Sequence, residues 1–185
     1  MTAQRQVAFL KGINVGGHRR MSMTELREVL KGLGYQGVET YLQSGNVVLE
    51  SDAPPDRVAR EIEEAIRKRF GVDVPVIVRT GEELAAIVAR NPLAKVAHDP
   101  KRYLVTFLSA EPPPDRVRQV TAIDVSPEQV VFDGREVCSW HPNGIHRSPL
   151  AQLLTEQRLG VCASARNWAT VTSLLDLVKR RDPRS

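Results

Sequence analysis

The first third of the chain alternates between short apolar runs and longer stretches in which apolar residues recur every three or four positions. Residues 7–10 are continuously apolar, which predicts a buried strand. From Ser22 onward, apolar residues recur at helical spacing as far as Leu33, and Ser22 and Glu25 have the spacing of a capping box. We therefore expect a helix that begins near Ser22 and ends at Gly34.

The pattern continues with elements of similar length up to residue 91. Two short strands are expected at 38–42 and 47–50, on either side of the turn sequence "QSGN". A second helix follows Pro54, with its apolar face ending before Gly71, and a strand is expected at 74–78. The sequence "TGEE" then repeats the capping-box spacing before a short helix.

The second half of the chain predicts the same order of elements. A strand at 103–108 precedes a helix at 113–120 and a hairpin of 129–132 and 135–140 around an Asp-Gly turn. One helix is expected from Ser148 to Gly160 and a very short strand at 161–163. The final helix is expected to begin at Ser164, with Arg166 and Asn167 in its first turn.

These patterns predict an α+β protein made of two small units, 1–95 and 96–185, with the second ending in a helix. Each unit has the order strand-helix-strand-strand-helix-strand-helix. The first six of these elements have the order of the ferredoxin-like split unit, whose antiparallel sheet packs against two helices. We therefore predict that the first unit is ferredoxin-like.

Composition and charge narrow the class of protein. The 185 residues are 42% apolar, carry a formal net charge of +4 and have a pI near 9.3. The first residues lack the pattern of a signal peptide, and no apolar run approaches the roughly 18 residues of a membrane helix. We expect a cytoplasmic protein without a membrane partner, whose two cysteines are reduced thiols. The sequence does not predict an oligomeric state.

The segment "KGINVGG" is the first candidate for chemistry, because it joins a strand to a helix and contains three glycines. Its backbone N–H groups have the freedom to converge on an anion, with Lys11 beside them. The spacing matches neither the Walker A motif nor the dinucleotide-binding G-x-G-x-x-G motif. A loop that only turns the chain from strand to helix explains the same glycines.

Three other polar loops resemble the first in their position next to strands and helix starts. "QSGN" joins two strands, and "HRSP" leads into a predicted helix, where Arg147, Ser148 and the helix amides can hold a phosphate or a carboxylate. "SARNW" begins the final predicted helix, with Arg166 and Asn167 in its first turn, where an Arg opposes the helix dipole unless an anion compensates. A role of Ser148 as the N-cap of the helix explains this residue equally well. The candidate ligand-binding residues are Lys11, Gly12, Asn14, Gly16, Gly17, Gln43, Ser44, Asn46, Arg147, Ser148, Arg166, Asn167 and Trp168.

Familiar catalytic and metal-binding patterns are absent from the sequence. Cys138, His141, His146 and Cys162 are close in sequence, but their spacing matches no standard zinc pattern, so we expect no metal. No residue stands out as a nucleophile or a general base, and the sequence leaves the cofactor unknown. RNA binding on a ferredoxin-like sheet requires exposed aromatic residues, but only 5% of the chain is aromatic.

Four segments, "VAFLKGINVGG", "TYLQSGNVV", "NGIHRSPL" and "ARNWATV", together resemble a bacterial family catalogued as domain of unknown function number sixteen ninety-seven. The resemblance implies a two-part α+β protein whose first part is ferredoxin-like. It implies no activity and no catalytic residue. The chain departs from the family pattern at Lys11, where Arg is common, and at His146 and Pro149, where the family has Gly and Lys.

The sequence therefore favours a protein that binds a polar, anionic small molecule with a phosphate or carboxylate group. It assigns binding roles only, and leaves open whether a reaction is catalysed. The alternative is a nucleic-acid or protein interaction module, in which the polar loops are only turns and caps.

Overall fold

The computed structural model describes residues 2–180 of the chain, which form two compact units. Of the described residues, one unit contains 2–87 and 173–180, and the other contains 88–172. The division at residue 95 expected from the sequence differs from this grouping, which places the residues from Ser173 onward with the first unit. Each unit contains a four-stranded antiparallel sheet with helices, so the predicted α+β class is confirmed.

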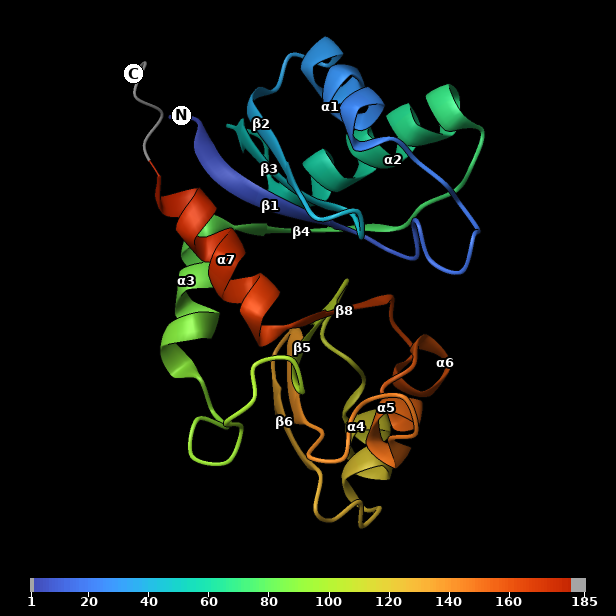
Figure 1. Cartoon of the computed structure of the whole chain (residues 1–185), viewed down its shortest axis with the longest axis vertical. Coiled ribbons are helices and arrows are strands. Elements are labelled where there is room, and N and C mark those ends of the chain that lie inside the picture. Colours follow the sequence, from blue (N-terminus) through green and yellow to red (C-terminus); the bar gives the residue numbers. More distant parts are fainter. Residues whose placement is uncertain (1, 181–185) are drawn as a thin grey trace. The chain divides into compact units, whose positions relative to one another are not determined.

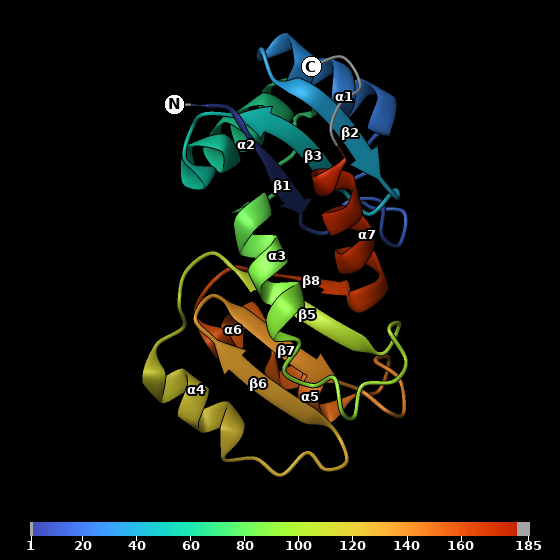
Figure 2. The same cartoon turned by 90° about the vertical axis from the view of Figure 1, so that its left-hand side faces the viewer.

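The first unit has the predicted order of elements, and its strands pair in the order β2-β3-β1-β4 (Figures 1 and 2). Helices α1 and α2 cover one face of this sheet (Figure 1). The elements are β1 (Gln4–Leu10), α1 (Met23–Gly32), β2 (Gln36–Tyr41), β3 (Asn46–Ser51), α2 (Pro55–Phe70), β4 (Val76–Thr80) and α3 (Gly81–Arg90).

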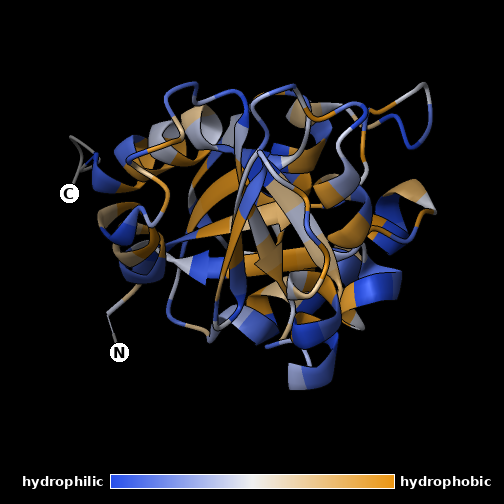
Figure 3. Cartoon of the chain, turned by 90° about the horizontal axis from the view of Figure 1, so that it is seen from below, coloured by the Kyte–Doolittle hydropathy of each residue, from blue (hydrophilic) through white to orange (hydrophobic). Residues whose placement is uncertain are grey.

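Alternation along the strands builds the core of this unit. Ala8 and Leu10 of β1 are fully buried in the cluster that also contains Leu26 of α1 and Ile62 of α2. Successive strand residues point to opposite faces, so one face of each strand meets the helices. In Figure 3 the hydrophobic colours gather on the strands, whereas the helices carry both hydrophobic and hydrophilic residues, as amphipathic helices do.

The helix ends in the first unit follow the local signals in the sequence. Ser22 is the N-cap of α1, and its Oγ accepts a hydrogen bond from the backbone N–H of Glu25. Thr80 and Glu83 form the reciprocal pair of a capping box at the start of α3, with distances of 2.8 and 3.1 Å. Gly71 ends α2 with φ of 68°, a conformation that favours glycine.

The second unit repeats the sheet order as β6-β7-β5-β8. Helices α4, α5 and α6 lie on one side of the sheet (Figure 1), where their apolar residues pack on Leu108 and Val137. The elements are β5 (Tyr103–Leu108), α4 (Pro114–Thr121), β6 (Gln129–Asp133), β7 (Glu136–Trp140), α5 (Pro149–Leu153), α6 (Glu156–Leu159) and β8 (Ala163–Asn167). Helix α7 (Trp168–Lys179) begins in this unit, and its residues from Ser173 onward belong to the first unit.

Two expectations for the second unit are wrong. The single helix expected from Ser148 to Gly160 is divided into α5 and α6, because Thr155 has an extended backbone and caps a new helix. The final helix begins at Trp168 instead of Ser164, and Arg166 and Asn167 lie in β8, paired with Val105 and Leu104 of β5. The sheet hydrogen bonds that β5 offers to this segment outweigh its local helical pattern.

Candidate functional site

The glycine loop between β1 and α1 contains a small hairpin of its own. The N–H of His18 donates to the carbonyl oxygen of Val15 at 3.1 Å, so residues 15–18 form a four-residue turn. The two central residues, Gly16 and Gly17, have φ of 59° and 80°. Positive φ at both central positions is typical of a type I′ turn, which explains why glycines stand there.

Asn14 closes this loop with its side chain. Its Nδ2 donates to the carbonyl oxygens of Met21 at 3.1 Å and Gln43 at 2.7 Å, and its Oδ1 accepts from the N–H of Met21 at 2.8 Å. The bond to Gln43 joins the glycine loop to the β2–β3 turn, 29 positions away in the sequence. The Asn14 amide therefore shapes the loop, and these contacts occupy both of its polar atoms.

A cavity of about 490 Å³ lies where these two loops meet, and we call it the glycine-loop pocket. Arg20 is the charged residue in its wall, and Ser22 places the N-terminus of α1 there. The backbone at Gly17 forms an open part of the wall, because a Cβ added there would meet nothing within 4 Å. The pocket is lined by Asn14, Gly17, Arg20, Met21, Ser22 and Gln43.

The other candidates in the first unit lie outside the residues that line this pocket. Lys11 and Gly12 follow β1 directly, and the Lys11 N–H donates to the carbonyl oxygen of Pro75. Asn46 is fully buried, and its Nδ2 donates to the Tyr41 carbonyl oxygen and to Ser44 Oγ, which holds the β2–β3 turn. Of the first-unit candidates, the pocket thus brings together Asn14, Gly17 and Gln43.

The candidates in the second unit have contacts of their own. Trp168 stacks on Tyr103, with ring centroids 4.6 Å apart, and Asn167 Oδ1 accepts from the N–H of Thr170 in the first turn of α7. Arg166 donates from Nη1 to Ser164 Oγ at 2.9 Å, and burial lowers its pKa to about 10. Arg147 is exposed.

Ser148 belongs to a buried polar network around His141. His141 Nδ1 lies 2.8 Å from Ser148 Oγ and 3.2 Å from Glu128 Oε1, and Nε2 lies 2.8 Å from Ser139 Oγ. Because Nδ1 faces a carboxylate, it carries the hydrogen, and Nε2 accepts from the Ser139 hydroxyl. Burial lowers the pKa of His141 in spite of the opposing effect of Glu128.

This network has the connectivity of a serine–histidine–glutamate triad but not its exposure. Ser139 and His141 are fully buried, so no substrate can reach the hydroxyl that would attack. The remaining contacts are structural, since Glu128 Oε2 accepts from the N–H of Leu150 and Ser148 Oγ accepts from that of Ala151. The network therefore fixes the start of α5 on the sheet.

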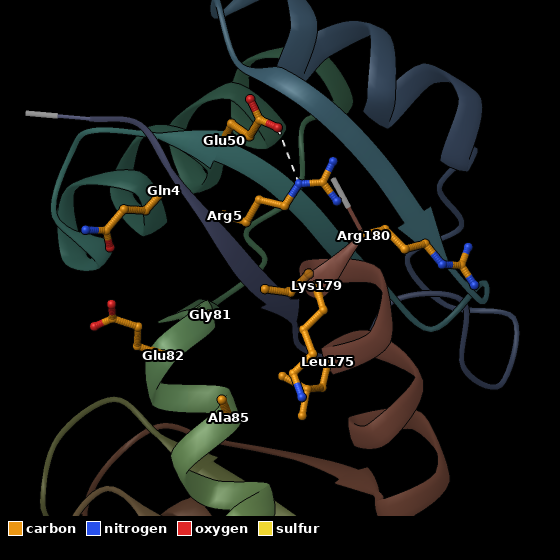
Figure 4. Close-up of a pocket in the computed structure, with 10 residues that line it drawn as sticks. Gln4, Arg5, Glu50, Gly81, Glu82, Ala85, Leu175, Lys179 and Arg180 are labelled. Carbon is orange, nitrogen blue, oxygen red and sulfur yellow. Dashed lines mark hydrogen bonds and ion pairs between the residues drawn. The ribbon is translucent and has the colours of Figure 1, made fainter. Parts of the chain in front are cut away.

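A second cavity of the first unit, about 630 Å³, lies between α3 and the last turns of α7 (Figure 4). Arg5 and Glu50 in its wall form an ion pair of 3.3 Å, drawn as a dashed line in Figure 4. Arg5 Nη1 also donates to the carbonyl oxygen of Leu177 at 2.7 Å. The wall also contains Lys179 and Arg180, but Glu50 and Glu82 lie in it as well, so we rank this cavity of mixed charge below the glycine-loop pocket, whose wall has no acidic residue, as a site for an anion.

Comparison with known proteins places the chain in a family. The model of a family described as "Protein of unknown function (DUF1697)" matches residues 3–138. The chain belongs to this family, which confirms the resemblance seen in the sequence. The description of the DUF1697 family names no activity. No curated protein matches it.

A solved structure shows the same fold as this DUF1697 protein. The conserved bacterial protein SP0830 from Streptococcus pneumoniae is similar with a TM-score of 0.78, over 96% of this chain and 99% of that one. The two sequences are 22% identical, so the likeness extends to the fold alone. Within residues 2–180, no helix has the length and apolar character needed to span a membrane.

The structure adds Arg20, Met21 and Ser22 to the candidates derived from the sequence. A signal for Arg20 was present, because His18, Arg19 and Arg20 directly follow the glycine pair and residues 11–24 contain no Asp or Glu. Within the described part of the chain, no group of three or more His, Cys, Asp or Glu side chains could hold a metal ion.

Proposed function

We propose that this protein, a cytoplasmic member of its family with a ferredoxin-like first unit, binds a small phosphate- or carboxylate-bearing molecule in the glycine-loop pocket. The observation that carries the proposal is the charge of the pocket wall. Arg20 is its one charged residue, and none of the six lining residues is Asp or Glu. A cation without an acidic neighbour attracts anions more strongly than one already paired.

The surroundings of the pocket support the same charge preference. Arg19 and Arg20 have no ion pair with an acidic side chain among residues 2–180. The first N–H groups of a helix have no acceptor within the helix, and the dipole of α1 adds partial positive charge at this end. Arg20 together with the N-terminal amides of α1 therefore offers both charge and hydrogen-bond donors.

The lining favours binding over catalysis. None of the six residues is Asp, Glu, His, Lys or Cys, so the pocket wall supplies no usual general acid or base, and its one hydroxyl, Ser22 Oγ, caps α1 by accepting from the N–H of Glu25. The alternative of RNA binding on a sheet has less support, because Phe107 is fully buried and Tyr103 is covered by Trp168. Bases need exposed rings on which to stack.

Thermal unfolding with a set of anions tests the proposal. The set contains inorganic phosphate, pyrophosphate, citrate and adenosine monophosphate, with sodium chloride of equal ionic strength as the control. A bound anion at about 100 times its dissociation constant adds about 2.7 kcal/mol to the free energy of unfolding and raises the melting temperature. If no anion raises it beyond the chloride control, while single-stranded RNA binds with a steep salt dependence, the interaction-module alternative replaces this proposal.

A further inference from the structure

The side-chain amide of Gln6 in β1 is buried, and its oxygen atom has no hydrogen-bond partner in the described structure. The side chain is 2% exposed, and its Nε2 lies 2.8 Å from the carbonyl oxygen of Ala53 and 3.5 Å from that of Ser51. These two oxygens fix the orientation of the amide, because the opposite orientation would bring Oε1 against them. Oε1 has no hydrogen-bond partner in the described structure. A buried acceptor without a donor is costly, so such atoms are rare in native proteins.

Gln6 lines a cavity of about 330 Å³, which we call the Gln6 cavity. It lies beside the start of β1 and the connection from β3 to α2, and its wall includes Gln4, Asp52, Pro54 and Pro55. Its volume lies near the lower end of the range for small-molecule sites.

The chemistry of this wall selects a donor with positive charge. Asp52 is the one charged residue among the nine that line the cavity, and it is exposed. Pro54 caps α2 and Pro55 follows it, so the helix start lacks an N–H that would otherwise attract an anion. The hydroxyl oxygens of Ser51 and Thr80 already accept hydrogen bonds from the backbone. Of the acceptors in this wall, Gln6 Oε1 is buried without a partner among the described residues, and the exposed Asp52 carboxylate supplies the negative charge, which also acts on the nearby Arg57.

We propose that the Gln6 cavity binds a primary ammonium group. One N–H of the ammonium donates to Gln6 Oε1, its charge lies near Asp52, and the attached carbon chain packs on Pro54 and Pro55. Because Oε1 is covered, entry of the ammonium requires side chains of the cavity wall to change rotamer, and exposed side chains do so within picoseconds to nanoseconds. A free amine and the lysine side chain of a peptide carry the same group. This site is separate from the proposed anion pocket.

Nuclear magnetic resonance of the full chain tests the site without altering it. Butylammonium is expected to shift the Gln6 side-chain amide resonances in a saturable way, because Oε1 gains a donor. Tetramethylammonium has the same charge and no N–H group, and is expected to leave them unchanged. Equal shifts with both cations, or none with either, would overturn the proposal, because Oε1 would then make no bond to the ammonium.

Two variants separate the role of Asp52 from the general charge of the protein. Asp52→Asn is expected to weaken butylammonium binding roughly two- to fivefold, the range for an exposed ion pair. Asp56→Asn removes the same charge from an exposed residue of α2 outside the cavity and is expected to leave the affinity unchanged. Equal losses in both variants would contradict a specific role for Asp52.

A peptide with one lysine that binds more tightly than butylammonium identifies a lysine side chain as the ligand, and weaker binding identifies a free amine.

Discussion

Asn14 connects the sequence of the glycine loop to its shape. It has φ of 54°, a conformation that Asn tolerates better than most residues, and its amide makes three hydrogen bonds to Met21 and Gln43. The Asn14 amide thus pairs with both the N–H and the carbonyl oxygen of Met21, as a neighbouring strand would, and holds the segment that leads into α1.

Replacement of Asn14 tests this role. Asn14→Ala loses three hydrogen bonds of about 1 kcal/mol each, reduced by partial exposure, and places a Cβ without compensation in a left-handed conformation. We expect the free energy of unfolding to fall by about 3 kcal/mol in urea. Asn14→Gly loses the same bonds without the backbone cost, so its free energy of unfolding should fall by about 1 kcal/mol less than that of Asn14→Ala. Losses below about 0.5 kcal/mol in both variants would show that the bonds do not hold the loop.

His141 makes stability depend on pH near neutrality. Burial lowers its pKa in the folded state, while the unfolded chain has the ordinary value of about 6.5. As the pH falls through that value, the unfolded state binds a proton first, so the free energy of unfolding decreases. Above about pH 7.5 the imidazole is neutral in both states, and this dependence ends.

Melting temperatures between about pH 7.5 and 5.5 measure the effect of His141. We expect the decrease toward low pH to become shallower in His141→Gln, because the titrating group is gone. His146→Gln is the matched control, since His146 is exposed and lies outside the buried network, and it should keep the slope of the parent protein. A slope that is unchanged in His141→Gln would contradict the assignment.

At the scale of elements, the β2–β3 turn packs directly against the end of β1. Gly45 has φ of 87°, and a Cβ there would lie 2.6 Å from Ile13 Cδ1 and 2.8 Å from the Leu10 Cβ. Its carbonyl oxygen also accepts from the N–H of Leu10 at 2.8 Å. This turn and the glycine loop thus form one packed unit around the pocket.

Gly45→Ala is expected to lower the free energy of unfolding by about 3 kcal/mol, because it combines left-handed strain with a steric clash. Gly134→Ala is the matched control in the β6–β7 turn, where φ is 58° and a Cβ would meet nothing within 4 Å. It should cost only the backbone term of about 1–2 kcal/mol. Equal losses in urea unfolding would mean that the close packing at Gly45 has no energetic weight.

The elements of the first unit were predictable from the sequence because local signals and tertiary packing agree there. Ser22, Thr80 and Gly71 end or begin helices where their local chemistry predicts. The segment around Arg166 and Asn167 was predicted wrongly because its pairing partner, β5, lies about 60 positions earlier in the sequence. The helix break at Thr155 likewise depends on an N-cap within a pattern that is otherwise helical.

At the scale of the whole molecule, the order of elements predicted the α+β class of both units, whereas the candidate site was only partly predictable. Glycines and polar residues identified the loop of 11–17, but the hydrogen bond from Asn14 to Gln43 joins residues 29 positions apart and has no local signal. The same limit applies to the His141 network, whose four members come from β7, from the residue directly after it, from the N-cap of α5 and from the segment before β6.

The central claim is that the glycine-loop pocket binds an anion through Arg20, and calorimetric titration with inorganic pyrophosphate tests it most directly. We expect saturable binding to the parent chain and a loss of about tenfold or more in Arg20→Gln, the cost of removing a charged hydrogen-bond donor. Arg60→Gln removes the same charge from an exposed position of α2 and should bind like the parent. Equal affinities for the two variants, or no saturable binding to the parent chain, would contradict the account.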